Sequence, residues 1–180
     1  HLGGTTTNNL TNYTYNNFDQ VQTQNQAHAT SPAGAASTNL NLTKNLYYDT
    51  ANRLREVWNN NTITAHHNYN PIGQLTEKKL HRIGASGNNF LKSVDYQYNP
   101  RGWLTQINQL ALGSSNDINQ DAFAQTLSYE ANGNIAGIQI KSAYPDGSNA
   151  YNVTDLDADY TYDNLNRLLT ANAQLVAPAT

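Results

Sequence analysis

Hydrophobic and polar residues alternate along much of the chain in short runs, and most runs end in a cluster of turn-forming residues. Tyr96-Gln97-Tyr98 and Tyr160-Thr161-Tyr162 show the alternation before a turn, and residues 134–140 show it after one. A period of two places alternate side chains on one face of a strand. No long stripe with the helical period of 3.6 residues follows a capping residue. The pattern therefore predicts an all-β chain of many short strands.

One seven-residue pattern recurs six times along the chain. Position 0 is Tyr, position 1 is Asp, Asn or Glu, and positions 2 and 3 are free. Position 4 is Gly, Asn or Asp, position 5 is a polar residue or Trp, and position 6 is aliphatic. The copies are residues 15–21, 48–54, 69–75, 98–104, 129–135 and 162–168. The steps between the six tyrosines range from 21 to 33 residues, which is typical of hairpins with fixed turns and loops of variable length.

Each copy has the residues of a tight turn. Asp or Asn at position 1 can accept a backbone hydrogen bond from two residues further on. Pro71 and Pro100 at position 2 suit a type I turn, which needs φ near −65° there. Gly or Asn at position 4 suits a positive φ. A type I turn followed by such a residue is a common hairpin connection with a G1 bulge, so the sequence predicts six hairpins whose tyrosines form an aromatic ladder.

The copies at 48–54 (Tyr48-Asp49-Thr50-Ala51-Asn52-Arg53-Leu54) and 162–168 (Tyr162-Asp163-Asn164-Leu165-Asn166-Arg167-Leu168) resemble the YD repeat, Y-D-x-x-G-R-L, of RHS proteins, teneurins and Tc-type toxin shell subunits. The resemblance covers roughly residues 12–172. Trp103 and Asn134 replace the repeat's Arg, and the first copy has Asp19-Gln20. The residues identified as structural repeat positions are Tyr15, Tyr48, Asp49, Arg53, Tyr69, Gly73, Tyr98, Gly102, Tyr129, Gly133, Tyr162, Asp163 and Arg167.

This resemblance implies a fold and a function. The fold is a curved strip of consecutive antiparallel β-hairpins within a spiralling RHS-type β-shell. The function is structural: the shell is extracellular, secreted or on the cell surface, and encloses or displays a C-terminal cargo or toxin domain. The implied partners are the remainder of the same RHS polypeptide, an enclosed toxin domain, or a larger surface or secretion complex. No catalytic residue and no cofactor is implied.

The organisation expected is one YD-repeat segment, 1–180, with turns near 16–19, 49–52, 70–73, 99–102, 130–133 and 163–166. Because the chain begins with His1 and contains no Met, we expect a processed product or a fragment of a longer polypeptide. Residues 22–41 are rich in Thr, Ala, Asn, Gln and Ser, so a long surface loop or poorly ordered stretch is expected there. Residues 108–125 are expected to form a second excursion, and Tyr144–Ser148 a turn.

Composition argues against several classes of protein. Charged residues are 13% and the formal net charge is −3, with Lys and Arg scattered, so the basic patch of a nucleic-acid partner is lacking. There is no Cys, and hence no disulfide framework. No apolar run is long enough to predict membrane insertion. With 28 Asn and 12 Tyr among 180 residues, the composition favours turns and strands.

Candidate chemistry is sparse. His66, His67 and His81 are the best metal candidates, but a strand places His66 and His67 on opposite faces. Residues 155–159 alternate Asp with Leu and Ala like the start of a calcium loop, yet Tyr160 and Asn166 stand where such a loop needs Gly and Glu. The alternation fits an acidic strand face better. No Gly-x-Ser-x-Gly motif is present, and nothing singles out a carboxylate pair, so we expect no enzyme.

Two other functions compete with a shell. In the first, the chain is an adhesion or glycan- and protein-binding scaffold, in which Trp103, exposed tyrosines or the loop 108–125 contact the partner. In the second, it is a secreted fragment bound to a secretion or surface assembly, because a strip of hairpins has two open edges.

Overall fold

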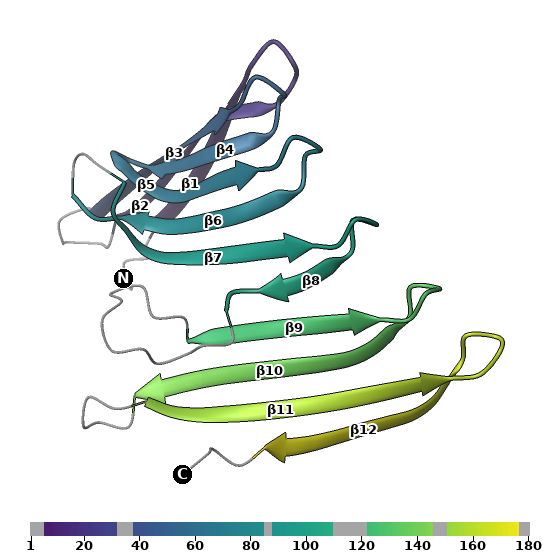
Figure 1. Cartoon of the computed structure of the whole chain (residues 1–180). Helices are drawn as coiled ribbons and strands as arrows, with labels where there is room; N and C mark the ends of the chain where they lie inside the picture. Colours follow the sequence, from purple (N-terminus) through teal and green to yellow (C-terminus); the bar gives the residue numbers. More distant parts are fainter. Residues whose placement is uncertain (1–5, 32–37, 85–87, 110–121, 146–150, 177–180) are drawn as a thin grey trace. The chain divides into compact units, whose positions relative to one another are not determined.

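The computed structural model describes residues 6–31, 38–84, 88–109, 122–145 and 151–176. Throughout these residues the chain is all-β, with twelve strands and no helix (Figure 1). The strands form one open sheet in which hydrogen-bonded neighbours follow the order of the sequence, from β1 to β12. Antiparallel pairing of successive strands is what short hairpin connections produce. The prediction of an all-β chain of consecutive antiparallel hairpins is confirmed.

The chain divides into two compact units, residues 1–67 with 80–90 and residues 68–79 with 91–180. The first four strands belong to unit 1, the last five to unit 2, and β5, β6 and β7 contribute residues to both. The strands are β1 (Thr6–Tyr15), β2 (Val21–Ser31), β3 (Thr38–Tyr48), β4 (Leu54–Asn59), β5 (Thr62–Tyr69), β6 (Leu75–Arg82), β7 (Phe90–Tyr98), β8 (Leu104–Ile107), β9 (Phe123–Tyr129), β10 (Ile135–Pro145), β11 (Tyr151–Tyr162) and β12 (Leu168–Val176).

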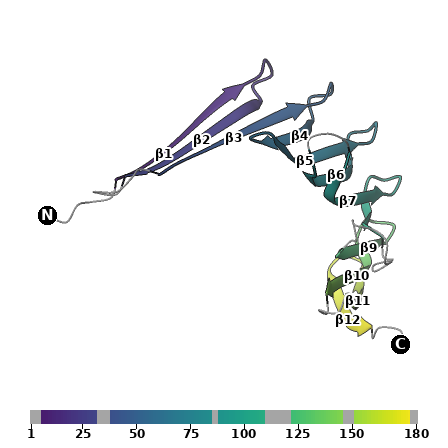
Figure 2. The same cartoon turned by 90° about the vertical axis from the view of Figure 1, so that its left-hand side faces the viewer.

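In unit 1 the prediction of a loop over residues 22–41 is wrong. Most of this stretch is strand, because β2 runs to Ser31 and β3 begins at Thr38. β2 pairs with β1 from Val21 to Ser31 and with β3 from Thr23 to Thr30, so its backbone is hydrogen-bonded on both sides (Figure 2). Main-chain pairing needs no apolar side chains, and Thr suits a strand. Low hydrophobicity was therefore a misleading signal of a loop here.

In unit 2 the alternation of side chains sorts β9 to β12 into two faces. Leu127, Ile138 and Ala158 lie opposite one another across β9, β10 and β11, and Ile140, Leu156 and Leu175 form the next row. The other face carries rows of polar residues, for example Thr126, Gln139, Asp157 and Gln174. One apolar and one polar face are typical of an antiparallel sheet.

The buried core of each unit is small. Ile63 and Phe90 are the buried hydrophobic residues of unit 1, and three alanines, 124, 143 and 158, are those of unit 2. Among the described residues no large side chain is fully buried. Apolar burial of this extent is too small to fix the order of strands alone, so the contacts between neighbouring hairpins carry much of the specificity.

Two expected connections lie largely outside the described residues. Residues 110–121 of the excursion 108–125 are not described, although its last part enters β9 at Phe123. Of the turn predicted over Tyr144–Ser148, Tyr144 and Pro145 belong to β10, which ends at Pro145, and residues 146–148 are not described. Of the described residues, none belongs to a helix long and apolar enough to cross a membrane.

Candidate functional site: the joints between hairpins

Six tight turns of one geometry connect the strands β1–β2, β3–β4, β5–β6, β7–β8, β9–β10 and β11–β12. In each turn the N–H of position 4 donates to the C=O of position 1, and the N–H of position 1 donates to the C=O of position 5, with N···O distances of 2.9–3.1 Å. Position 4 has a positive φ in every copy, from 57° at Asp19 to 100° at Gly133. Register shifts such as that between Gln97 and Tyr98 mark the bulge. The predicted positive φ at position 4 is confirmed.

The side chain of position 1 closes the turn from inside. In the turn after β3, Oδ1 of Asp49 accepts hydrogen bonds from the N–H groups of Ala51 and Arg53, both at 2.9 Å. Asn16, Asn99 and Asp163 accept the same two bonds from positions 3 and 5 of their own turns. Glu130 has one methylene more, and there Oδ1 of Asn132 accepts from the N–H of Asn134 at 3.1 Å instead.

In four of the six turns the side chains of positions 1 and 5 are chemically matched. Where position 1 is Asp, position 5 is Arg: Arg53 Nε lies 2.7 Å from Asp49 Oδ2, and the Arg167–Asp163 distance is 2.6 Å. Where position 1 is Asn and position 5 is Gln, the Asn amide donates to the Gln oxygen, at 3.0 Å in the first turn and 2.7 Å in the third. Gln is therefore a matched partner for Asn at position 5.

These hydrogen bonds change the acidity of the two aspartates. The backbone N–H of Arg53 and then its guanidinium hold the pKa of Asp49 below its usual value of 3.8. The pKa of Asp163 is lowered in the same way, first by the backbone N–H and then by the side chain of Arg167. Each bond favours the charged carboxylate. Both turns are thus held most firmly when the aspartate is ionised.

Tyrosine at position 0 joins a hairpin to the one before it in four of the copies. The Tyr48 hydroxyl donates to the carbonyl of Val21 at 2.8 Å, and that of Tyr98 to Leu75 at 2.9 Å. The same bond runs from Tyr129 to Leu104 at 2.6 Å and from Tyr162 to Ile135 at 3.0 Å. In all four bonds the acceptor is the carbonyl of position 6 of the preceding copy.

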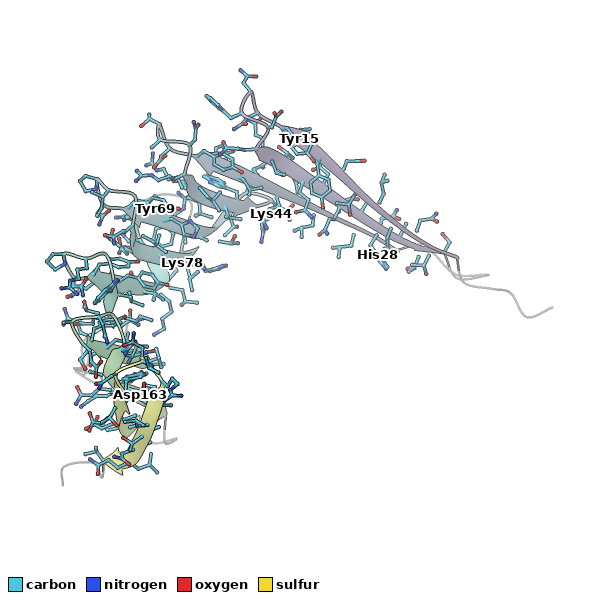
Figure 3. The ribbon with its side chains drawn as sticks, turned by 90° about the vertical axis from the view of Figure 1, so that its right-hand side faces the viewer. Tyr15, His28, Lys44, Tyr69, Lys78 and Asp163 are labelled. Atoms are coloured by element: carbon cyan, nitrogen blue, oxygen red, sulfur yellow. The ribbon has the colours of Figure 1, made fainter. Side chains whose placement is uncertain are left out.

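The predicted aromatic ladder of these tyrosines is therefore wrong as the joining contact. Position-0 tyrosines lie on every second strand, which separates them by about 9.5 Å, beyond the usual range of ring contacts. The observed ring contact Tyr47–Trp58, with centroids 5.8 Å apart, joins adjacent strands instead. Tyr15, at the turn end of β1 (Figure 3), and Tyr69, at the end of β5, occupy the same position of the repeat.

Position 5 also reaches the next turn, which sequence reasoning missed. Gln20 Nε2 donates to the carbonyl of Asn52 at 2.9 Å, and Gln74 Nε2 to that of Gly102 at 3.2 Å. Asn134 Nδ2 reaches Oδ1 of Asn166 at 3.2 Å. The acceptor residue is always position 4 of the following copy. In unit 2 the turns after β7, β9 and β11 lie side by side at the same end of the strands (Figure 1).

Trp103 makes this turn-to-turn contact by packing. A Cβ added at Gly133 would lie 3.0 Å from Trp103 Cζ2, so the indole occupies the space that the glycine leaves open. The Tyr129 ring lies 5.2 Å from the Trp103 ring, and the Arg101 guanidinium lies 5.1 Å from the indole centroid. Trp103 is half-buried, and these contacts of its indole are made within the sheet.

Two asparagines with positive φ use their side chains to make hydrogen bonds to strand backbone groups, as a paired strand residue would do with its own backbone. Sequence reasoning did not single them out. Asn108 is buried, with Oδ1 accepting from the Asp95 N–H at 2.8 Å and Nδ2 donating to the Phe123 carbonyl at 2.9 Å. Asn60 does the same for Thr43, whose N–H donates to Oδ1 at 3.1 Å. Their φ values are 53° and 51°. An Asn soon after a post-turn strand was the available signal.

A polar network crosses the strands of unit 2 around Glu77. Its carboxylate accepts hydrogen bonds from Asn68 at 2.6 Å and Ser93 at 3.0 Å, and Lys79 lies 3.4 Å away. Burial raises the pKa of Glu77, but these three partners outweigh it and leave the pKa below its usual value. Desolvation and then the Glu77 charge raise the pKa of Asp95. Glu77 is held by its neighbours as a structural carboxylate.

The candidate metal ligands are separate from one another. His66 Nδ1 lies 3.2 Å from Glu56 Oε1, and the His66 ring contacts Phe90. Asp155, on β11, forms an ion pair at 3.0 Å with Lys141 of the neighbouring strand β10. Over the described ranges, no group of three or more His, Cys, Asp or Glu residues is placed to hold a metal ion.

The residues that recur in this structure are therefore those of turns and joints, and their partners lie within their own turn or in a neighbouring hairpin. No protein-family model matches the chain, and no curated protein matches it.

Proposed function

We propose that this chain has a structural role, as a YD-repeat segment of an RHS-type β-shell. The shell is secreted or held at the cell surface, and it encloses or displays a cargo domain of the same polypeptide. The observation that carries the proposal is the repeated joint between hairpins. Four position-0 tyrosines donate to position 6 of the preceding copy. Three position-5 side chains reach position 4 of the next.

The chemistry of the joint supports a structural role. Its acceptors are mostly backbone carbonyls, such as those of Leu75 and Gly102, which every residue type supplies. A hairpin with Tyr at position 0 therefore fits any preceding hairpin, and the strip can be lengthened without new side-chain chemistry. Joints of this kind are suited to building an extended sheet rather than a single binding site.

Electron microscopy of the intact polypeptide that contains this segment tests the proposal. A hollow particle with internal density is the expected result. An open strip or a filament without an interior would contradict enclosure and favour a scaffold for adhesion.

A protease-protection assay on that polypeptide tests the joints themselves. Tyr98→Phe combined with Tyr129→Phe removes two joint hydroxyls and should expose the enclosed cargo to cleavage sooner. Tyr96→Phe is the matched control, since Tyr96 lies on β7 together with Tyr98 but at no position of the repeat. Equal cleavage rates for the double variant and the control would count against a protective wall.

A further inference from the structure

Gly137 on β10 stands where the other copies of the repeat carry a polar side chain. It lies two residues after position 6, at what we call position 8, the first residue to pair after the bulge. Position 8 of the other five copies is Thr23, Glu56, Glu77, Gln106 or Thr170. Four of these follow a bulge of the same kind, and Gly137 is not among the described glycines with positive φ. The backbone therefore does not require glycine here, and a glycine inside a strand often marks the close approach of a ligand.

In two other copies the side chain at position 8 bonds to the strand that follows. Thr23 Oγ1 donates to Oδ1 of Asn45, which lies opposite it on β3, at 3.0 Å. Glu77 Oε1 accepts from Ser93 Oγ on β7, also at 3.0 Å. The residue opposite Gly137 on the following strand β11 is Asp159. Because Gly137 has no side chain, Asp159 lacks this cross-strand partner.

The missing side chain leaves a hollow of about 430 Å³ on the polar face of unit 2. A Cβ added at Gly137 would lie 3.0 Å from Ser128 Oγ and 3.2 Å from Asp159 Oδ1, so these two side chains border the hollow. Its polar lining comes from four strands and consists of Thr126, Ser128, Gln139, Asp157, Asp159 and Gln174. The volume is within the range of small-ligand sites.

Two carboxylates in this hollow have no counter-charge. Asp157 and Asp159 lie on one face of β11, with their Cα atoms roughly 6–7 Å apart. To the described residues neither side chain makes a hydrogen bond or an ion pair, whereas Asp155 on the same face pairs with Lys141. β11 is paired on both sides, with β10 and β12, so these surroundings do not depend on what lies beyond β12. The hollow therefore fits a cationic hydrogen-bond donor.

We propose that this hollow binds an arginine side chain from an extended peptide segment of a partner protein. The guanidinium takes the place of the missing position-8 side chain at Asp159 and also donates to Asp157. Its planar fork of five N–H donors matches carboxylates better than a lysine ammonium does, and it is more weakly hydrated. The bare backbone at Gly137 gives the aliphatic part of the side chain room. This inference does not rest on the proposed shell.

Titration of the ¹⁵N-labelled chain with the peptide acetyl-Gly-Arg-Gly-amide, followed by NMR, tests the proposal. The backbone amides of Gly137, Asp157 and Asp159 should shift and saturate. The same peptide with citrulline, the neutral analogue of arginine, should cause no saturable shift, and the peptide with lysine should bind more weakly. No saturable shift with the arginine peptide, or equal binding of the citrulline or lysine peptide, overturns the proposal.

Two aspartate variants separate a specific contact from general attraction. Asp159→Asn keeps the shape of the hollow and should weaken binding roughly tenfold, since it removes a charged acceptor. Asp155→Asn is the matched control, because it removes one negative charge from the same face of β11 and does not line the hollow. Its binding should stay close to that of the parent chain. Equal effects of the two variants overturn the proposal.

Gly137→Thr tests the hollow itself. It introduces the residue that the copies at 15–21 and 162–168 have at position 8, so it should fill the hollow and abolish binding of the arginine peptide. Threonine favours strands, so the thermal midpoint followed by far-UV circular dichroism should not fall. Binding retained by a folded Gly137→Thr chain overturns the proposal. Should this variant be unstable, Asp159→Asn decides the question, because it leaves the packing unchanged.

Discussion

At the scale of single residues, the repeat is a set of hydrogen-bonding positions with fixed partners. Position 1 closes its own turn, and position 0 binds the preceding hairpin. Position 5 pairs with position 1 of its own turn and also contacts the next turn. Asp with Arg and Asn with Gln are alternative solutions to the same geometry. The copies can therefore differ in sequence while the joint is kept.

Removing one joint hydroxyl tests the role of position 0. Tyr98→Phe leaves the half-buried Leu75 carbonyl without its donor at 2.9 Å, and the expected loss is about 1 kcal/mol of unfolding free energy. Urea denaturation followed by circular dichroism measures it. Tyr96→Phe should change the midpoint much less, and an equal effect of the two would show that the hydroxyl bond contributes little.

Gly133→Ala tests the space under Trp103. Both Gly102 and Gly133 have positive φ, 84° and 100°, so alanine at either position costs about 1–2 kcal/mol of backbone strain. At Gly133 the new Cβ would also lie 3.0 Å from the indole, whereas at Gly102 it would meet the flexible end of Gln74 at 3.2 Å. Gly133→Ala should therefore lower the thermal midpoint more than Gly102→Ala. In the Trp103→Ala background this difference should disappear.

The acid dependence of stability follows from two aspartates whose pKa values shift in opposite directions. The pKa of Asp49 is lowered in the folded chain, so its contribution is present above the unfolded value of 3.8 and is lost as pH falls below it. The pKa of Asp95 is raised, so its unfavourable contribution is relieved at higher pH, as pH falls through the raised value to the unfolded value of 3.8.

Asp49→Asn should therefore reduce the loss of stability on acidification, and Asp95→Asn should increase it. Denaturation midpoints measured from neutral pH down to below the unfolded aspartate pKa test both. The same slope for both variants would contradict the assigned shifts.

At the scale of elements, the short strand β8 depends on Asn108 for its connection to its neighbours. Its side chain bridges the backbone of Asp95 on β7 and of Phe123 on β9. Asn108→Ala leaves two backbone groups without partners, which costs about 2–4 kcal/mol. The exposed Gln109→Ala is the control. Chemical denaturation measures both changes, and a loss no larger than that of the control would mean that the bridge is dispensable.

At the scale of the whole molecule, a sheet with small cores should open from its outer strands. All nine residues of β12 are exposed, and β1 is exposed from Thr7 to Tyr15, whereas β2 and β11 each have a strand on both sides. Hydrogen exchange read by mass spectrometry at the lowest workable concentration should show β12 exchanging before β11 and β1 before β2. Protection of β12 equal to that of β11 would indicate that its edge is already covered.

Much of the local structure could be predicted from the sequence alone. The six turns, the positive φ at position 4 and the backbone bonds to position 1 follow from residue types within five positions of one another. Such contacts depend only on local backbone geometry, which Asn, Gly and Pro restrict directly. The all-β class follows from the same short-range pattern.

Only the tertiary structure determined which contacts the hairpins make with one another. Strand pairing turned the polar residues 22–31 into β2, because main-chain hydrogen bonds are indifferent to side-chain hydrophobicity. The spacing of alternate strands made the position-0 tyrosines bind carbonyls rather than stack, and it gave position 5 its contact with the next turn. These contacts join residues about thirty positions apart. Their partners are set by sheet register, which a single repeat does not encode.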